Sequence, residues 1–147
     1  MYEELYHHGV KGMKWGVRRN LRKSADFQES KKKVKQSHRK YWDAEGAYDS
    51  SVRKAQVEFD TKRPYKRDAT RDETLEWEID RYVHVLNKSH SAQQKRDRAK
   101  QEYKQLLDDT VNRYGNTLIG DVKVSERQRQ RINRIIRDEL VKDIFKD

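Results

Sequence analysis

Hydrophobic residues recur at helical intervals through most of this chain, and they predict long helices. The interval between residues 24 and 62 carries one row of apolar residues spaced by seven and a second row four residues further on. The first row is Phe27, Val34, Tyr41, Tyr48 and Ala55, and the second is Val52 and Phe59. This spacing is typical of a coiled-coil-like seam. Its stronger half lies between Tyr41 and Phe59, and the helix is expected to begin near Ser24 or Asp26.

The only proline, Pro64, interrupts this pattern, and a second helix is predicted from about 71 to 113. Thr70 followed by Glu73 is a capping box for its start. Its first half carries an apolar stripe, which lapses and then returns: Leu75, Ile79, Tyr82, Val83 and Leu86, then Tyr103, Leu106, Leu107 and Tyr114. Two long helices joined by a short break fold back antiparallel. We therefore expect the stripe at 75–86 to pack against the seam at 41–59.

A third helix is predicted from about 125 to 145. Gly115 is expected to end the second helix, and the following NTLIGDVKV has strand-like character but is too short to form a sheet. Ser125 with Gln128 forms a second capping box. The apolar residues of this helix are Ile132, Ile135, Ile136, Leu140 and Ile144. They are expected to pack across the open end of the hairpin, near Phe27, Val34, Leu107 and Tyr114.

The predicted fold is therefore all-α, a long antiparallel coiled-coil-like hairpin with a C-terminal helix. The helical domain covers residues 24–147, and residues 1–23 are expected to form an extended, basic, glycine-rich arm. Composition limits the core of such a fold, because only 33% of the 147 residues are hydrophobic and 41% are charged. The net charge is +10, and the arm is its most one-sided part, with six basic and two acidic residues. Such a chain is attracted to polyanions or to acidic partners.

Several classes of site and of location are not expected. The chain has no cysteine, so it forms neither disulfides nor thiolate metal sites. No apolar run is long enough for a membrane span, and the start lacks the apolar core of a secretory signal. The five histidines show no metal-binding or catalytic spacing, and the glycines do not form a phosphate-binding loop. We predict a protein that is not an enzyme and needs no metal or cofactor.

The opening HHGVKGMKWGVRR is poorly suited to folding alone and is typical of a segment that docks. Three glycines oppose helix formation, and apolar residues alternate with basic ones. A tryptophan flanked by arginines is common at the centres of protein interfaces. The alternative is that Trp15 folds back onto the hairpin. The residues predicted to bind a partner are His7, His8, Gly9, Lys11, Gly12, Met13, Lys14, Trp15, Gly16, Arg18 and Arg19.

The run from His7 to Arg19 resembles a short N-terminal motif of tailed-bacteriophage and prophage proteins. In those proteins it begins otherwise dissimilar chains, often minor head or capsid-associated proteins. The resemblance covers 13 of the 147 residues, and the helical body resembles no family. It implies that the segment binds a common partner, such as a capsid, portal or scaffold protein, or marks a processing site.

Three functions follow as hypotheses. The first is a phage structural or virion-associated protein, located in the virion or the host cytoplasm, whose body is a spacer, a cargo or an element that binds copies of itself. The second is a nucleic-acid-binding protein that uses the basic arm and a second basic cluster. That cluster consists of Lys31, Lys32, Lys33 and Lys35. The third is a small phage inhibitor of a host defence protein. No membrane partner is expected.

Overall fold

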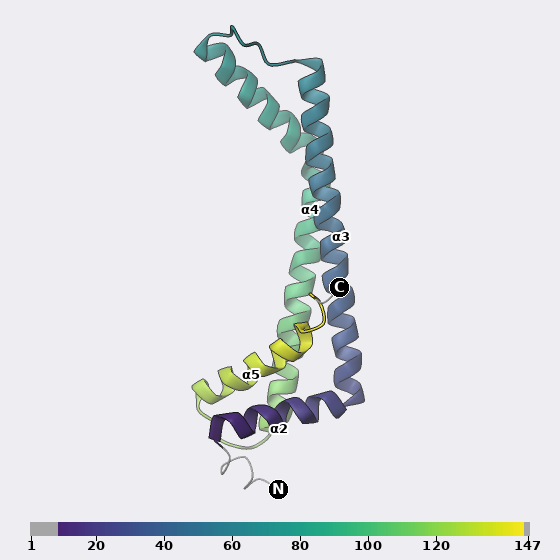
Figure 1. Ribbon diagram of the computed structural model, residues 1–147, viewed down its shortest axis with the longest axis vertical. Coiled ribbons are helices and arrows are strands. Elements are labelled where there is room, and N and C mark those ends of the chain that lie inside the picture. Colours follow the sequence, from purple (N-terminus) through teal and green to yellow (C-terminus); the bar gives the residue numbers. More distant parts are fainter. Residues whose placement is uncertain (1–8, 146–147) are drawn as a thin grey trace. The chain divides into compact units, whose positions relative to one another are not determined.

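The computed structural model describes residues 9–145, with side chains from residue 16 onward, and its regular elements are all helices (Figure 1). They are α2 (Gly9–Lys23), α3 (Ala25–Lys62), α4 (Arg71–Ile119) and α5 (Glu126–Val141). The predicted all-α class is confirmed. Within the described range, no helix has the length and apolar character needed to cross a membrane.

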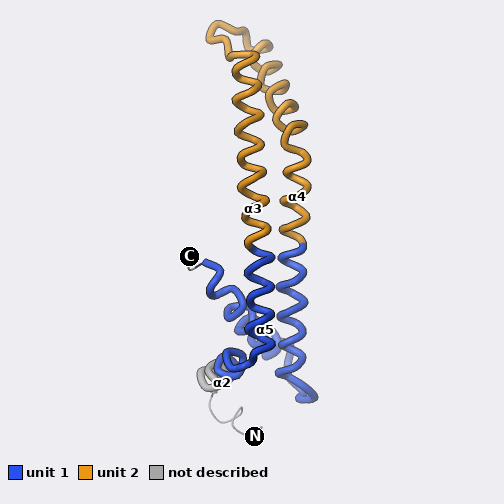
Figure 2. The backbone as a smooth tube through the Cα atoms, turned by 90° about the vertical axis from the view of Figure 1, so that its right-hand side faces the viewer, with its two compact units in different colours: residues 1–38, 102–147 blue, residues 39–101 orange. Residues whose placement is uncertain are grey.

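The chain divides into two compact units (Figure 2): unit 1 is residues 1–38 and 102–147, and unit 2 is residues 39–101. Helices α3 and α4 contribute to both units. In unit 1, the rings of Phe27 and Tyr114 meet edge to face at 5.0 Å, and those of His38 and Tyr103 do the same at 5.0 Å. Residue numbers rise along α3 as they fall along α4, so the two helices are antiparallel. The predicted hairpin pairing is confirmed.

Local capping explains where the helices begin. The hydroxyl of Ser24 accepts a backbone hydrogen bond at the start of α3. Thr70 and Glu73 exchange the two bonds of a capping box ahead of α4, at 2.8 and 3.3 Å. Ser125 and Gln128 do the same ahead of α5. Each of these side chains satisfies backbone N–H groups that a helix start leaves unpaired, and all three predicted starts are confirmed.

The apolar core of unit 1 is formed by all four helices. Helices α2 and α5 lie side by side across the ends of α3 and α4 that belong to this unit (Figure 1). The buried members are Val17, Leu21, Phe27, Val34, Leu107, Val111, Tyr114, Ile119, Ile132, Ile135, Ile136 and Leu140. The predicted packing of α5 near Phe27, Val34, Leu107 and Tyr114 is therefore confirmed. The contribution of α2 was not predicted.

The prediction for the first half of α4 is wrong. Its apolar stripe is solvent-exposed: Leu75 55%, Ile79 53%, Tyr82 67%, Val83 46% and Leu86 43%. The side of α4 that faces α3 instead carries Trp77, Arg81 and His84, which contact α3 through rings and an ion pair. Two residues along a helix turn the side chain by about 200°, so the stripe lies nearly opposite this contact face.

Gly115 does not end α4, contrary to prediction, because the helix continues to Ile119. The stop is Gly120, whose φ of 54° lies in the left-handed region that glycine adopts without strain. Gly115 has a different role. A Cβ at this position would lie 2.2 Å from Oδ1 of Asn133, so the missing side chain lets α5 approach α4 closely.

The arm differs from its prediction as well, since residues 9–23 form a helix rather than an extended segment. Val17 and Leu21 lie one helical turn apart and are both buried. Glycine disfavours a helix by about 1 kcal/mol per residue, but tertiary burial of an amphipathic face outweighs such propensities. The helix therefore forms because the body supplies an apolar surface for it.

A buried leucine, Leu140, and an exposed one, Leu75, provide a test of this core. Leu140→Ala removes a fully buried side chain and is expected to lower the free energy of unfolding by about 2–5 kcal/mol. Leu75→Ala, the same change at an exposed site, is expected to change it by less than about 0.5 kcal/mol. Urea denaturation in dilute solution measures both. Equal losses would contradict the exposed position of Leu75.

Candidate docking site

The candidate site is the surface around the C-terminal half of α2, which the body of unit 1 holds in place. Val17 and Leu21 are buried in the apolar core, and α2 contacts α5. Arg19 and Lys23, on the other side of the helix, are exposed. One face of α2 is therefore an anchor and the other presents positive charge.

A buried carboxylate provides the polar part of this anchor. Glu139 of α5 is only 3% exposed. It accepts two hydrogen bonds from the guanidinium of Arg22, both at 3.1 Å, and Nε of Arg18 lies 3.4 Å away. Burial acts to raise the pKa of Glu139, but the hydrogen bonds and charge of Arg22, with Lys142 and Arg18, outweigh it and lower the pKa. The carboxylate therefore stays ionised and fixes the orientation of α2 on α5.

An open cleft of about 510 Å³ borders this helix. Its lining residues are Gly16, Arg18, Arg19, Arg22 and Lys23. Four of these five residues are basic, and of these only Arg18 and Arg22 contact Glu139. A concave surface with one sign of charge attracts groups of the opposite sign. Its chemistry therefore fits the carboxylates of an acidic partner surface.

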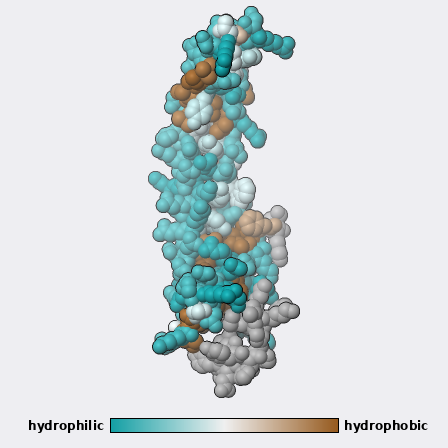
Figure 3. Space-filling model, turned by 90° about the vertical axis from the view of Figure 1, so that its left-hand side faces the viewer, coloured by the Kyte–Doolittle hydropathy of each residue, from teal (hydrophilic) through white to brown (hydrophobic). Residues whose placement is uncertain are grey.

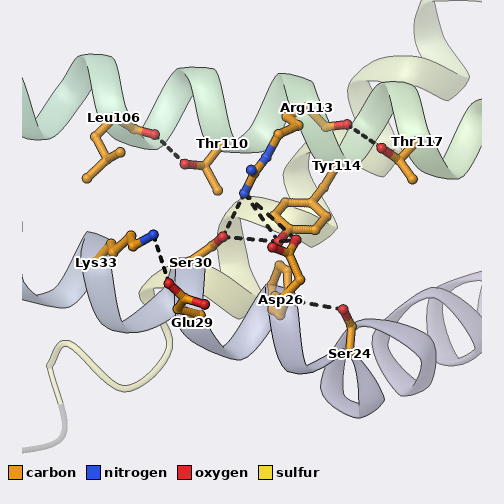
Figure 4. Close-up of polar contacts among 11 residues, drawn as sticks. Ser24, Asp26, Glu29, Ser30, Lys33, Leu106, Thr110, Arg113, Tyr114 and Thr117 are labelled. Atoms are coloured by element: carbon orange, nitrogen blue, oxygen red, sulfur yellow. Dashed lines mark hydrogen bonds and ion pairs between the residues drawn. The ribbon is translucent and has the colours of Figure 1, made fainter.

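A polar cluster joins the start of α3, which follows α2, to α4 (Figure 4). The hydroxyl of Tyr114 hydrogen-bonds to the carboxylate of Asp26, and Ser30 lies 3.0 Å from the same hydroxyl. Arg113 donates to Ser30 at 2.7 Å. Burial raises the pKa of Tyr114, and the bond to Asp26 raises it further, so the phenol stays protonated as a donor. The cluster fixes the first turn of α3, directly after α2, against α4.

The structure describes only part of the predicted partner-binding segment. His7 and His8 lie outside the described residues. Gly9, Lys11, Gly12, Met13, Lys14 and Trp15 belong to α2, and their side chains also lie outside the described part. Gly16 and Arg19 are exposed, as a docking surface requires, whereas Arg18 contacts Glu139.

The predicted nucleic-acid cluster is not a continuous basic surface. Lys31 pairs with Asp143 at 2.5 Å and Lys33 pairs with Glu29 at 2.9 Å. Lys32 is exposed, and Lys35 also takes part in an interaction within the chain. These pairings neutralise much of the charge that phosphate binding would use.

Sequence reasoning missed the residues that anchor α2, which are Val17, Leu21, Arg22 and Glu139. The four-residue spacing of Val17 and Leu21, continued by Arg18 and Arg22 on the neighbouring side, was the available signal. The three glycines that precede Val17 indicated an extended segment instead of a helix. The acidic partner could not be identified, because Glu139 lies 117 positions from Arg22.

The described side chains show few other sites. Among them, no group of three or more His, Asp or Glu is placed to hold a metal ion. A second cleft, of about 170 Å³, lies in unit 2 beside the turn between α3 and α4. Arg63, Lys66, Glu73, Glu76 and Trp77 are among its lining residues, so its charges are mixed. The basic cleft on α2 is the better candidate for a docking site.

The ion pair of Glu139 predicts a pH-dependent contribution to stability. Because its folded pKa lies below the ordinary value of 4.5, ionised Glu139 stabilises the fold above that pH and loses the effect as pH falls through the folded pKa. Glu139→Gln should lower the free energy of unfolding by about 1–2 kcal/mol at neutral pH. Urea denaturation over a pH series should show this difference vanish in acid. Glu102→Gln, at an exposed site, is the control, and a pH-independent loss for Glu139→Gln would contradict the assignment.

Comparison with known proteins gives a match to a family model. Residues 1–21 match the model of a family of unknown function, DUF7211. No curated protein and no solved structure matches the chain. The matched segment contains the whole opening motif and ends at Leu21, the buried anchor of α2.

Proposed function

We propose that this protein is a non-enzymatic phage structural or virion-associated protein. Its N-terminal segment docks on a capsid, portal or scaffold protein. The helical body acts as a spacer, as cargo or as an element that binds copies of itself. The observation that carries the proposal is the attachment of α2: its C-terminal half is part of the core of unit 1, while the same helix continues back into the opening motif. The motif is thus held on a folded support.

This attachment favours docking over removal of the segment by processing. Cleavage after residue 23 would take Val17 and Leu21 out of the core and leave Glu139 buried without Arg22. A buried carboxylate that loses its partner strongly destabilises a fold. A segment made only to be cut off has no need for such contacts, so we propose that it stays on the protein.

The charge of the exposed side of α2 suggests the chemistry of the partner. The basic cleft presents Arg19, the last residue of the motif, and Lys23, which follows it. Charged residues around an interface govern the rate and specificity of association. The proposed partner surface is therefore acidic.

The nucleic-acid alternative has less support. The lysines expected to contact phosphates include two that form ion pairs within the chain, Lys31 and Lys33. The basic and acidic residues of the hairpin also pair with each other across α3 and α4 in unit 2. A protein that tracks nucleic acid needs a face dominated by positive charge.

The test is incorporation into particles. We expect mass spectrometry of purified phage or prophage particles to detect peptides of this chain from both sides of residue 20. Deletion of residues 1–15 keeps Val17, Leu21 and the arginines that contact Glu139, so the body should keep its fold. This variant, and the double variant Arg19→Glu with Lys23→Glu, should be absent from particles or reduced to background.

A matched control reverses two exposed basic residues of α3 in unit 2, Arg53→Glu with Lys54→Glu, and should leave incorporation unchanged. Circular dichroism and urea denaturation establish that each variant is folded. Incorporation of the deletion variant at the level of the intact chain would refute docking through the segment. Detection of the body without its N-terminal peptides would instead favour processing.

A further inference from the structure

An apolar stripe on α4 is solvent-exposed in unit 2. Figure 3 shows one group of apolar side chains toward the hairpin turn, with hydrophilic side chains around it. The stripe consists of Leu75, Ile79, Tyr82 and Leu86, with Val83 beside it, and each of these side chains is 43–67% exposed. Contiguous apolar surface of this kind usually marks an interaction site.

The stripe is not a poorly packed part of the hairpin interior. The opposite side of α4 is engaged with α3, because Arg81 forms two hydrogen bonds to Asp60 at 2.7 and 3.0 Å. Trp77 also donates from its indole N–H to the carbonyl of Arg63 at 2.7 Å. Turning the stripe inward would break these contacts. Another surface is needed to cover it.

The residues of the stripe are spaced as in a seam between paired helices. The order of the spacings is the same from either end of the stripe. Its members are separated by four, three and four residues, which is the heptad repeat of coiled coils. In an antiparallel pair of two such helices, Leu75 lies opposite Leu86 and Ile79 lies opposite Tyr82. Every apolar residue of the seam then meets an apolar residue. A two-fold contact between identical chains requires this self-complementarity.

The charge along α4 favours the antiparallel arrangement. Residues 72–80 contain five acidic and no basic residues, whereas residues 81–100 contain six basic residues and one acidic. A parallel pair in register places the two acidic segments beside each other. The antiparallel pair places residues 72–80 of one chain along residues 81–89 of the other, which carry no acidic residue and whose basic residues, Arg81 and Lys88, pair with Asp60 and Glu58 of α3. It therefore avoids the repulsion between like charges that a parallel pair would bring within a Debye length, about 8–10 Å.

We infer that the stripe on α4 binds the same stripe of a second copy of this chain in an antiparallel, two-fold contact. This inference does not depend on the partner of the N-terminal segment. It assigns the association between copies to residues 75–86 rather than to the seam between α3 and α4.

The first test is association of the full chain. Sedimentation equilibrium should show a concentration-dependent monomer–dimer equilibrium. Ile79→Asp and Tyr82→Asp place a charge in the seam and should each raise the dimer Kd by about tenfold or more. Val57→Asp is the matched control, because Val57 is an apolar residue of α3 with 65% exposure and should leave the Kd unchanged. Circular dichroism should report the same helix content for all three variants.

The second test determines orientation, and the absence of cysteine from the chain makes it direct. Leu75→Cys and Leu86→Cys are prepared as separate proteins, mixed and oxidised. A disulfide requires Cα atoms within about 7 Å. The antiparallel contact gives a mixed disulfide between the two variants, while each variant alone stays uncrosslinked, because equivalent positions lie about 16 Å apart along the axis.

Three results would overturn the inference. A chain that stays monomeric at every accessible concentration has no such contact. A dimer that Ile79→Asp and Tyr82→Asp leave intact uses another surface. Cross-linking of each variant with itself, in place of the mixed product, would establish a parallel pair.

Loss of particle incorporation on deletion of residues 1–15 with the dimer intact would separate this contact from N-terminal docking.

Discussion

The contact between Glu139 and Arg22 is the constraint on which the organisation of unit 1 depends. It joins two residues 117 positions apart and lies where α2 contacts α5. A carboxylate can be buried to this extent only when charged donors replace the water it loses. The partners of Glu139 come from α2, so the body tolerates this residue only when the N-terminal helix is in place. The N-terminal segment is thereby a part of the fold and not an appendage to it.

The pattern of apolar residues was sufficient to predict the class of fold, the antiparallel hairpin and the starts of three helices. These features depend on local signals, such as the proline break and the capping pairs of Thr70 with Glu73 and Ser125 with Gln128. The interior was harder to predict. Phe27 and Val34 had polar neighbours and suggested a weak seam, yet they are among the most buried residues. They lie in a core that α2 and α5 complete together with α4, whose Tyr114 contacts Phe27.

The candidate site could be located from the sequence, but its structure could not. The concentration of glycine, tryptophan and arginine before residue 20 marked the segment as unusual. The same glycines led to the wrong prediction of an extended arm, because helix propensity is a weak prior when tertiary burial is available. Val17 and Leu21 decide the outcome, and their effect depends on an apolar surface formed by residues more than a hundred positions later. Such long-range complementarity is not visible in one sequence.

The two units use the same pair of helices but stabilise them by different interactions. In unit 1 the helices share an apolar core, whereas in unit 2 the described buried residues are only Ala55 and Ser89. The contacts of unit 2 include ion pairs, aromatic contacts at its surface such as Trp77 against Phe59, and cations over rings such as Arg96 over Tyr48 at 4.2 Å. Solvent-exposed ion pairs contribute about 0–1 kcal/mol each. Unit 2 therefore has little stability of its own, and its best apolar side chains lie on the outside of α4. Such a helix pair gains the most stability when another helix covers that stripe. We therefore assign the exposed face of α4 to association between copies, and the polar contacts between α3 and α4 to the pairing of these two helices.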